Sequence, residues 1–331
     1  MKRILRVVAI LLMLACLLVL ITSGTIVAQA EIIEYSMTDK KAVKPQPNGY
    51  LSDWTYEDPS ISVSIATGRI HETNYMYAYV KLANGTQIRS AMSGSYYSPS
   101  TILGTSMVRN VNAVFAINGD YFSSRNGVGY VARMGKEYRN RCNGEYDVLV
   151  INDLGDLHIV KLPGKADMEA FTAQLQEAGR TVANGYTFGP GFVIDGVVQA
   201  DFMENMDADA QKAIAANKPA QHMCIAQVGP LEYLCICAEG PEDKGSTGLT
   251  LTQFAELVTS FEGIIDAYNL DGGSSTHMIL HACVAVLYGD ERVLRGLWLD
   301  SISAADEGYK GIRQQERTVP KGTVLCVSIK W

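Results

Sequence analysis

The sequence is poor in positive charge, and this limits the partners that the protein can bind. It contains 28 Lys and Arg against 35 Asp and Glu in 331 residues. The first thirty residues hold three of those bases and no acid, so 25 bases face 35 acids in the remainder. Binding of nucleic acid through its phosphates depends on Lys and Arg. The acidic body therefore argues against a nucleic-acid partner.

Several short motifs of common enzyme classes are also missing. There is no P-loop and no G-x-G-x-x-G segment after a predicted strand, which argues against the usual nucleotide cradles. The run Gly272–Ser275 lacks the G-x-S-x-G spacing of a serine hydrolase. Cys235 and Cys237 have no second cysteine cluster, and His277 and His281 have no evident third ligand, so neither pair predicts a zinc site. We expect no metal and no other cofactor.

Residues 1–30 contain the three parts of a secretory signal. Three basic residues precede an apolar run over residues 7–21, and small residues follow up to Ala30. The apolar stretch is also long enough to remain in a membrane as an anchor. We therefore predict an exported protein, either extracellular or membrane-anchored with its domain outside the cytoplasm. Cleavage and anchoring are both left open.

The rest of the chain divides at about residue 58. Residues 31–58 have no apolar period and contain prolines that disfavour helix, so they are predicted to form a stalk or linker. The remaining residues, 59–331, combine hairpins with helix–strand units. That mixture predicts a single large α+β domain with a mixed, mainly antiparallel sheet and a few packed helices.

Strands and helices of this domain are predicted from their hydrophobic periods. The best helix spans residues 251–262, where Thr250 and Gln253 provide a capping box. Two further helices are expected at residues 168–178 and 207–217. Strands are predicted at residues 61–65, 75–82, 111–117, 147–152, 157–162, 264–270, 283–287 and 323–329.

A hairpin is predicted around Gly229-Pro230. If these two residues form its loop, Cys224 faces Cys235 across the strands. The two cysteines then either form a disulfide or remain small buried apolar residues, and the second interpretation is favoured.

Two polar segments follow predicted apolar strands and carry the chemistry that the sequence offers. Residues 116–122 place Asn118 and Asp120 around a glycine, and residues 269–276 place Asp271 before two glycines and three hydroxyl groups. Glycine lets backbone N–H groups approach a ligand, and N–H groups with hydroxyls can cradle a phosphate. Two carboxylates can serve as acid and base, or as nucleophile and acid, at a glycosidic carbon. Asn-Gly and Asp-Gly are also ordinary turn dipeptides, so each segment alone is weak support for a site.

As a pair, in this order and this far apart, the two segments resemble the phosphodiester glycosidase domain family. Residues 188–196, 248–257 and 316–320 are similar to further segments of that family, and the resemblance covers residues 60 to 331. It implies a glycoside hydrolase of the phosphodiester α-N-acetylglucosaminidase type. Such an enzyme cleaves the bond between a sugar anomeric carbon and a phosphodiester, here on a cell-envelope or extracellular glycan.

The resemblance also implies roles for individual residues. Asp271 and Asp120 are expected to be the catalytic carboxylates and to line one cleft. The residues expected to bind substrate are Asn118, Gly272, Gly273, Ser274, Ser275, Arg133 and Arg317.

The chain departs from the family where two arginines usually stand. It has His222 in the first place and Pro241 in the second. Because arginine binds phosphate through two parallel hydrogen bonds, neither residue is an equivalent. Three consequences are open: Arg89, Arg133 or Arg317 replaces them, the substrate differs, or activity is lost.

Two rival hypotheses stand beside the glycosidase. One is a non-catalytic envelope module that binds a glycan or organises a surface polymer, and the other is a metal-dependent phosphodiesterase that uses Asp120, Asp271 and His277. Carbohydrate is the expected partner, with the membrane added if the N-terminal segment is retained.

Overall fold

The computed structural model describes residues 34–280 and 322–328, apart from residues 93, 96–97, 100–103, 122–126, 205, 207 and 215. The predicted leader at residues 1–30, the strand predicted at residues 283–287, His281 and Arg317 lie outside the described residues. Within the described part of the chain, no helix combines the length and apolar character needed to cross a bilayer.

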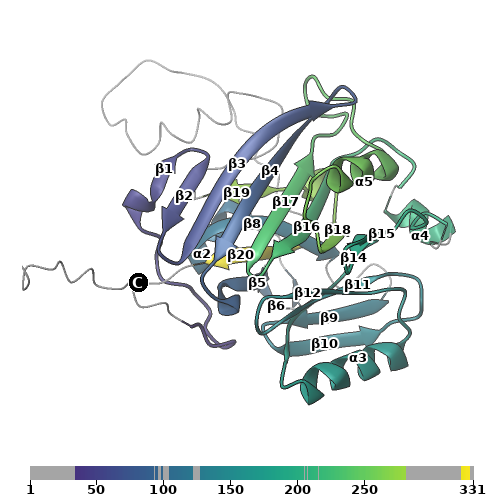
Figure 1. Ribbon diagram of the computed structural model, residues 1–331, viewed down its shortest axis with the longest axis horizontal. Coiled ribbons are helices and arrows are strands. Elements are labelled where there is room, and N and C mark those ends of the chain that lie inside the picture. The colour runs from purple at the N-terminus through teal and green to yellow at the C-terminus, as the bar shows by residue number, and fades with distance from the viewer. Residues whose placement is uncertain are drawn as a thin grey trace, which may run out of the picture. The chain divides into compact units, whose positions relative to one another are not determined.

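Three antiparallel sheets build the domain (Figure 1). The largest has nine strands, in the order β1 (Tyr50–Ser52), β2 (Thr55–Asp58), β3 (Ile61–Ile70), β4 (Thr73–Leu82), β17 (Glu232–Ala238), β16 (His222–Gly229), β18 (Asp266–Leu270), β14 (Gly191–Ile194) and β15 (Val197–Val198). The second has five strands, in the order β10 (Lys136–Arg141), β9 (Gly129–Arg133), β13 (Val182–Thr187), β11 (Val148–Asn152) and β12 (Leu157–Val160). The third has four, in the order β19 (Met278–Leu280), β8 (Ala113–Tyr121), β20 (Gly322–Ser328) and β5 (Ile88–Met92).

The smaller elements connect or cover these sheets. β6 (Gly94–Ser95) and β7 (Ser98–Pro99) form a separate short pair. The described helices are α2 (Gly104–Val111), α3 (Lys165–Glu177), α4 (Ala208–Ala213) and α5 (Leu251–Thr259), with single turns of 3₁₀ helix at η1 (Pro47–Gly49), η2 (Gly85–Gln87) and η3 (Gly273–Ser275). The α+β class is confirmed. The strand pairings of the described residues are all antiparallel, so the sheets are less mixed than the sequence suggested.

Alternate residues of the strands face two different cores. On β11, Leu149 and Ile151 belong to the main core, which also contains residues of the other two sheets. Val148 and Val150 point to the opposite face, where they pack with Met168 of α3. This alternation is the period of two expected for a strand buried on both faces. It places α3 on the outside of the five-stranded sheet, as Figure 1 shows.

Helix α5 confirms the sequence prediction in detail at its start. The hydroxyl of Thr250 accepts the N–H of Gln253, and the Gln253 side chain accepts the N–H of Thr250. The helix ends at Thr259, three residues earlier than predicted. Its buried Phe254 packs edge-on against Phe192 of β14, with the ring centroids 6.0 Å apart, so the helix covers one face of the nine-stranded sheet.

The segment predicted to be a stalk differs from that expectation in its described residues, 34–58. β1 and β2 extend the nine-stranded sheet, and the ring of Tyr56 is fully buried. Before them, the Arg89 guanidinium donates hydrogen bonds to the carbonyl oxygens of Ser36 at 3.2 Å and Asp39 at 2.5 Å. Single aromatic residues and long-range backbone pairing hold this segment, and neither produces a hydrophobic period.

The predicted cysteine hairpin exists, but with a different register. Cys224 lies opposite Ile236, and Cys235 lies opposite Ile225, because the loop is Pro230-Leu231 instead of Gly229-Pro230. Leu231 takes a positive φ of 58° in that loop. The predicted facing of Cys224 and Cys235 is therefore wrong. Both thiols are free and buried, as the favoured interpretation expected.

Candidate active site

The first polar segment is a strand and not the loop that the sequence predicted. β8 continues through Asn118, Gly119 and Asp120 to Tyr121 and pairs there with β20. Asn118 lies opposite Val324 and Tyr121 opposite Gly322, so β8 has one residue more than β20 over this stretch. Such a bulge bends a strand and redirects its side chains. The turn dipeptide Asn-Gly stays extended because a distant strand pairs with it.

The second polar segment follows β18 and contacts the end of β8. The N–H of Asp271 donates to the carbonyl oxygen of Gly119 at 3.0 Å, and Asn118 Nδ2 donates to the carbonyl oxygen of Asp271 at 2.6 Å. The N–H of His277 donates to Asn118 Oδ1 at 2.9 Å, and the N–H of Asn118 donates to the carbonyl oxygen of His277 at 3.2 Å. The two segments, about 150 residues apart in sequence, are thus held together by four hydrogen bonds.

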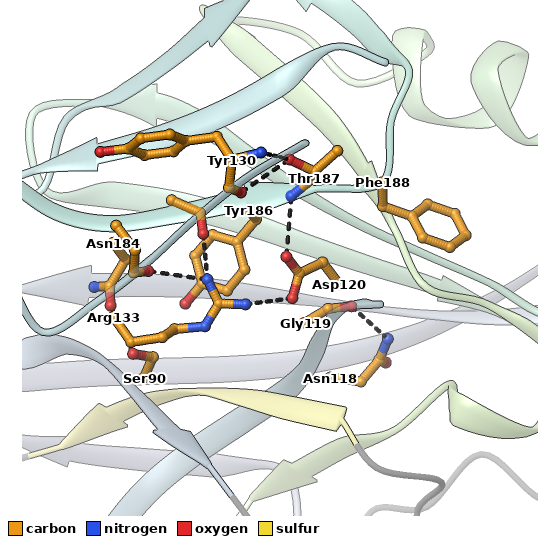
Figure 2. A network of polar contacts seen from close by, with 12 residues as sticks. Ser90, Asn118, Gly119, Asp120, Tyr130, Arg133, Asn184, Tyr186, Thr187 and Phe188 are labelled. Carbon is orange, nitrogen blue, oxygen red and sulfur yellow. Dashed lines mark hydrogen bonds and ion pairs between the residues drawn. The ribbon is translucent and has the colours of Figure 1, made fainter. Parts of the chain in front are cut away.

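Asp120 is buried and faces the five-stranded sheet. Figure 2 shows its carboxylate between the guanidinium of Arg133, on β9, and the backbone N–H of Thr187, at the end of β13. Oδ1 accepts from Arg133 Nη2, and Oδ2 accepts from Thr187 at 3.0 Å. Burial raises the pKa of Asp120, while the positive charge of Arg133 and the Thr187 N–H oppose that rise. The carboxyl group predicted to face substrate is therefore held inside the protein.

Arg133 is as deeply buried as its partner. Its Nη1 donates to the carbonyl oxygens of Gly185 and Ala132, and its guanidinium carbon lies 4.2 Å from the centre of the Tyr186 ring (Figure 2). The side chain is 3% exposed. Arg133 therefore joins the four-stranded sheet to the five-stranded sheet through Asp120. The substrate contact that the sequence predicted for it stays a prediction.

Asp271 is the more accessible of the two carboxylates. It is partly exposed, and its Oδ1 accepts the N–H of Gly272 at 2.9 Å. A Cβ on Gly272 would lie 2.5 Å from the carbonyl oxygen of Gln221, so only glycine fits where the loop passes β16. Gly273 follows with φ of 58° and begins η3. The two glycines thus shape a tight loop next to Asp271.

The backbone N–H groups of this loop are used internally. Those of Gly273, Ser275 and Thr276 donate to the carbonyl oxygens of Gln221, Gly272 and Gly273 respectively, at 2.9 to 3.1 Å. The N–H of Gly272 is also used, because it donates to Asp271 Oδ1. These four N–H groups are therefore not free to bind a phosphate. The phosphate cradle that the sequence suggested is therefore not supported by these groups. Ser275 is buried, and the side chain of Ser274 lies outside the described residues.

The residues that stand in place of the family arginines do not supply charge to the site. His222 is buried and stacked on Phe254, with the ring centroids 5.0 Å apart, and its Nε2 lies 2.7 Å from the carbonyl oxygen of Leu249. Burial lowers the pKa of His222 to about 4, so its imidazole is neutral at physiological pH. Pro241 is exposed. Arg89 is engaged by residues 36 and 39, as described above.

Sequence reasoning missed the contributions that come from the main chain. Gly119 and Gln221 hold the second segment through their carbonyl oxygens, and Thr187 holds Asp120 through its N–H. Any residue type can supply such groups, so no local signal marks them. Among the described residues, no three His, Cys, Asp or Glu side chains are grouped so that they could hold a metal ion.

A small surface hollow lies elsewhere. It lies between the segment that follows β13 and the segment that follows β12. Its lining includes Asp147, Leu162, Phe188 and Phe202. Neither Asp120 nor Asp271 lines it. The candidate site is therefore defined by the contacts between the two polar segments and not by this hollow.

Comparison with known proteins assigns the chain to a family. Residues 111–325 match the phosphodiester glycosidase family, a range that includes both polar segments. The chain belongs to the phosphodiester glycosidase family, as the resemblance implied. No curated protein matches the sequence.

A solved structure shares the fold. The catalytic domain of zebrafish N-acetylglucosamine-1-phosphodiester α-N-acetylglucosaminidase, described as auto-inhibited by its pro-peptide, aligns with a TM-score of 0.59 and 14% identity. That alignment covers 88% of this chain and 87% of the zebrafish chain. A hypothetical protein from Synechocystis aligns with a TM-score of 0.46 and 15% identity over 71% of this chain and 60% of its own.

Proposed function

We propose that this protein is an exported phosphodiester glycosidase. It hydrolyses the bond between a sugar anomeric carbon and a phosphodiester, so that water adds to the sugar carbon and the leaving oxygen takes a proton as a phosphomonoester. The observation that carries the proposal is the contact between the segments around Asp120 and Asp271 in a chain of this family. The substrate belongs to the cell envelope or an extracellular glycan, and the apolar segment at residues 7–21 supports export.

The two carboxylates have unequal parts in this proposal. Asp271 is the group at the reacting centre, because it is partly exposed and its backbone is held on both sides. Asp120 is the second carboxylate of the proposal. Because it is buried and paired with Arg133, we propose that it acts by holding β8 in place beside the loop that carries Asp271. Ser274 and Ser275 follow Asp271, and their hydroxyls are the proposed contacts to sugar and phosphate oxygens. Gly272 and Gly273 are proposed to contribute by shaping the loop, because their N–H groups already have partners inside the protein. Arg317 is proposed as the arginine that binds the phosphate.

A second candidate function is a non-catalytic module that binds a glycan or organises a surface polymer. The burial of His222 favours it, because this neutral side chain leaves the phosphodiester without one of the arginines of the family. The membrane is a further proposed partner if the N-terminal segment is retained.

The deciding experiment incubates the purified chain without residues 1–30 with the methyl diester of N-acetylglucosamine 1-phosphate and measures released sugar. The class of probe follows the name of the zebrafish relative. Turnover that disappears in Asp271→Asn supports the glycosidase. No turnover, with saturable binding of the same diester by calorimetry, favours the binding module instead.

A further inference from the structure

Asn118 differs from the other residues predicted to bind substrate, because both ends of its side-chain amide are used inside the protein. Nδ2 donates to the carbonyl oxygen of Asp271 at 2.6 Å, and Oδ1 accepts the N–H of His277 at 2.9 Å. The residue is 3% exposed. Nδ2 also donates to the carbonyl oxygen of Gly119 at 3.4 Å, so both of its hydrogens have partners, and burial keeps the amide from a ligand.

We propose that Asn118 is a positioning residue that holds the loop from Asp271 to His277 in register with β8. It does not bind substrate, and it acts on the reaction through Asp271. This inference rests on the proposed function, in which Asp271 is the group at the reacting centre.

The hold on Asp271 fixes the main chain on both sides of its side chain. Its N–H is bound by the carbonyl oxygen of Gly119, and its carbonyl oxygen is bound by Asn118 Nδ2. Both partners belong to consecutive residues of β8, which is itself paired with β19 and β20. The direction of the Asp271 carboxylate is therefore set by a strand with neighbours on both sides. A displacement of about 1 Å at a reacting group is enough to lower a rate about 10²-fold.

The same residue closes the other end of the loop. Asn118 and His277 exchange two hydrogen bonds, one through the Asn118 side chain and one through its backbone N–H. His277 Nδ1 lies 2.9 Å from the carbonyl oxygen of Ser275, which fixes the ring against the loop. One side chain thus fastens the first and the last residue of the segment that contains Gly272, Gly273, Ser274 and Ser275.

The first test compares Asn118→Ala with Asn152→Ala. Asn152 is also buried, at 2% exposed, and its side chain closes the turn after β11 by accepting the N–H groups of Leu154 and Asp156. That turn lies near Gln227, which pairs with Asp266 at the opposite end of β18 from Asp271. Both variants lose stability. Only Asn118→Ala is expected to lower kcat, by about 10²-fold, with KM changed less than about threefold.

The second test reads the contact without activity. Amide hydrogen exchange of His277 is expected to become about tenfold faster in Asn118→Ala, because its acceptor is gone, and to stay unchanged in Asn152→Ala. If wild type has no turnover on a sugar phosphodiester, the proposed function fails together with the effect on the reaction, and this measurement still decides whether Asn118 holds the loop. Unchanged exchange at His277 would overturn the positioning role.

The third test separates the two ends of the amide. Asn118→Asp has the same shape and keeps an acceptor for the His277 N–H. Burial raises the pKa of the new carboxyl group, so the variant is assayed at a pH above that pKa, where the ionised carboxylate repels the carbonyl oxygen of Asp271. There we expect kcat to fall as in Asn118→Ala while His277 stays protected from exchange. As pH is lowered, the carboxyl group protonates and donates again, so kcat relative to wild type should recover. A KM raised tenfold or more at unchanged kcat, in either Asn118 variant, would identify Asn118 as a substrate ligand and end the proposal.

Discussion

The Asp120 carboxylate and the Arg133 guanidinium form an ion pair in which neither side chain is accessible to solvent: they are 0% and 3% exposed. The pair connects β8 of the four-stranded sheet to β9 of the five-stranded sheet. The second oxygen of Asp120 takes the N–H of Thr187, so the desolvated charge has hydrogen bonds on both sides.

Removing one member of this pair should be costly, because the other charge is then left buried without a partner. Asp120→Asn and Arg133→Met are each expected to lower the free energy of unfolding by about 3–5 kcal/mol. The double variant should lose less than the sum of the two. Chemical denaturation measures all three. Lys81→Met is the control, because the Lys81–Glu232 pair is exposed and worth about 1 kcal/mol or less. Equal losses in the control and in Asp120→Asn would contradict the structural importance of the buried pair.

Substitution of Asp271 should affect rate without affecting folding. An asparagine retains an oxygen for the Gly272 N–H, so the loop survives, but the negative charge is lost. We expect turnover to fall at least about 10²-fold, the scale of losing an acid–base group, with an unchanged Tm. If Asp271 only completed a turn, asparagine would be a natural replacement and turnover would hardly change. Ser275→Ala, assayed in the same way, tests the proposed contact between the Ser275 hydroxyl and the substrate.

Gly272 should tolerate no side chain. The Cβ of Gly272→Ala would meet the carbonyl oxygen of Gln221 at 2.5 Å, and backbone atoms cannot move aside cheaply. The strain should cost about 1–3 kcal/mol and displace Asp271. Gly196→Ala is the comparison, since its Cβ would have open space and only the positive φ of 76° to accommodate. Thermal melts of both variants, with turnover of Gly272→Ala, check this expectation. A Gly272→Ala protein as stable and active as wild type would exclude the close approach.

The carboxyl group of Asp266 should destabilise the fold at neutral pH and stop doing so in mild acid, where it is protonated. Burial, with a smaller effect of Asp195, raises the pKa of Asp266 to about 6. The folded state therefore binds a proton more tightly than the unfolded state does, and this group's contribution to stability falls as pH rises from about 4 to 6. Asp266→Asn, which retains an acceptor for the Asp195 N–H, should raise Tm at pH 7. The gain should vanish near pH 4. A gain of equal size at both pH values would mean that the Asp266 carboxyl has an ordinary pKa.

Local signals predicted the elements that depend on local contacts. Thr250 and Gln253 cap α5 as expected, and the hairpin of β11 and β12 follows from two apolar strands joined by a turn that contains Asp153 and Gly155. The segment from Asp271 to Thr276 is a loop as expected, and Gly273 takes a positive φ of 58° in it.

The expectations that failed depend on distant partners. Asn118-Gly119 has the composition of a turn, and it stays extended because β20 pairs with it. The register between β9 and β13 turns Arg133 toward Asp120, a partner that no local signal indicates. Residues 34–58 were predicted to be a stalk, although Tyr56 is buried and Arg89 fastens the chain before it. A sequence contains no direct record of which strands become neighbours.

The position of β8 between β19 and β20 also bears on how the protein reaches its folded state. β8 and β20 are about 200 residues apart along the chain, and closing a loop of that length costs entropy before any contact compensates for it. The strand that carries Asn118 and Asp120 therefore obtains its second neighbour late in folding. Until then it has an open edge, and unpaired strand edges in incomplete folds are prone to aggregate. Factors that protect newly made chains would act on this protein during that interval.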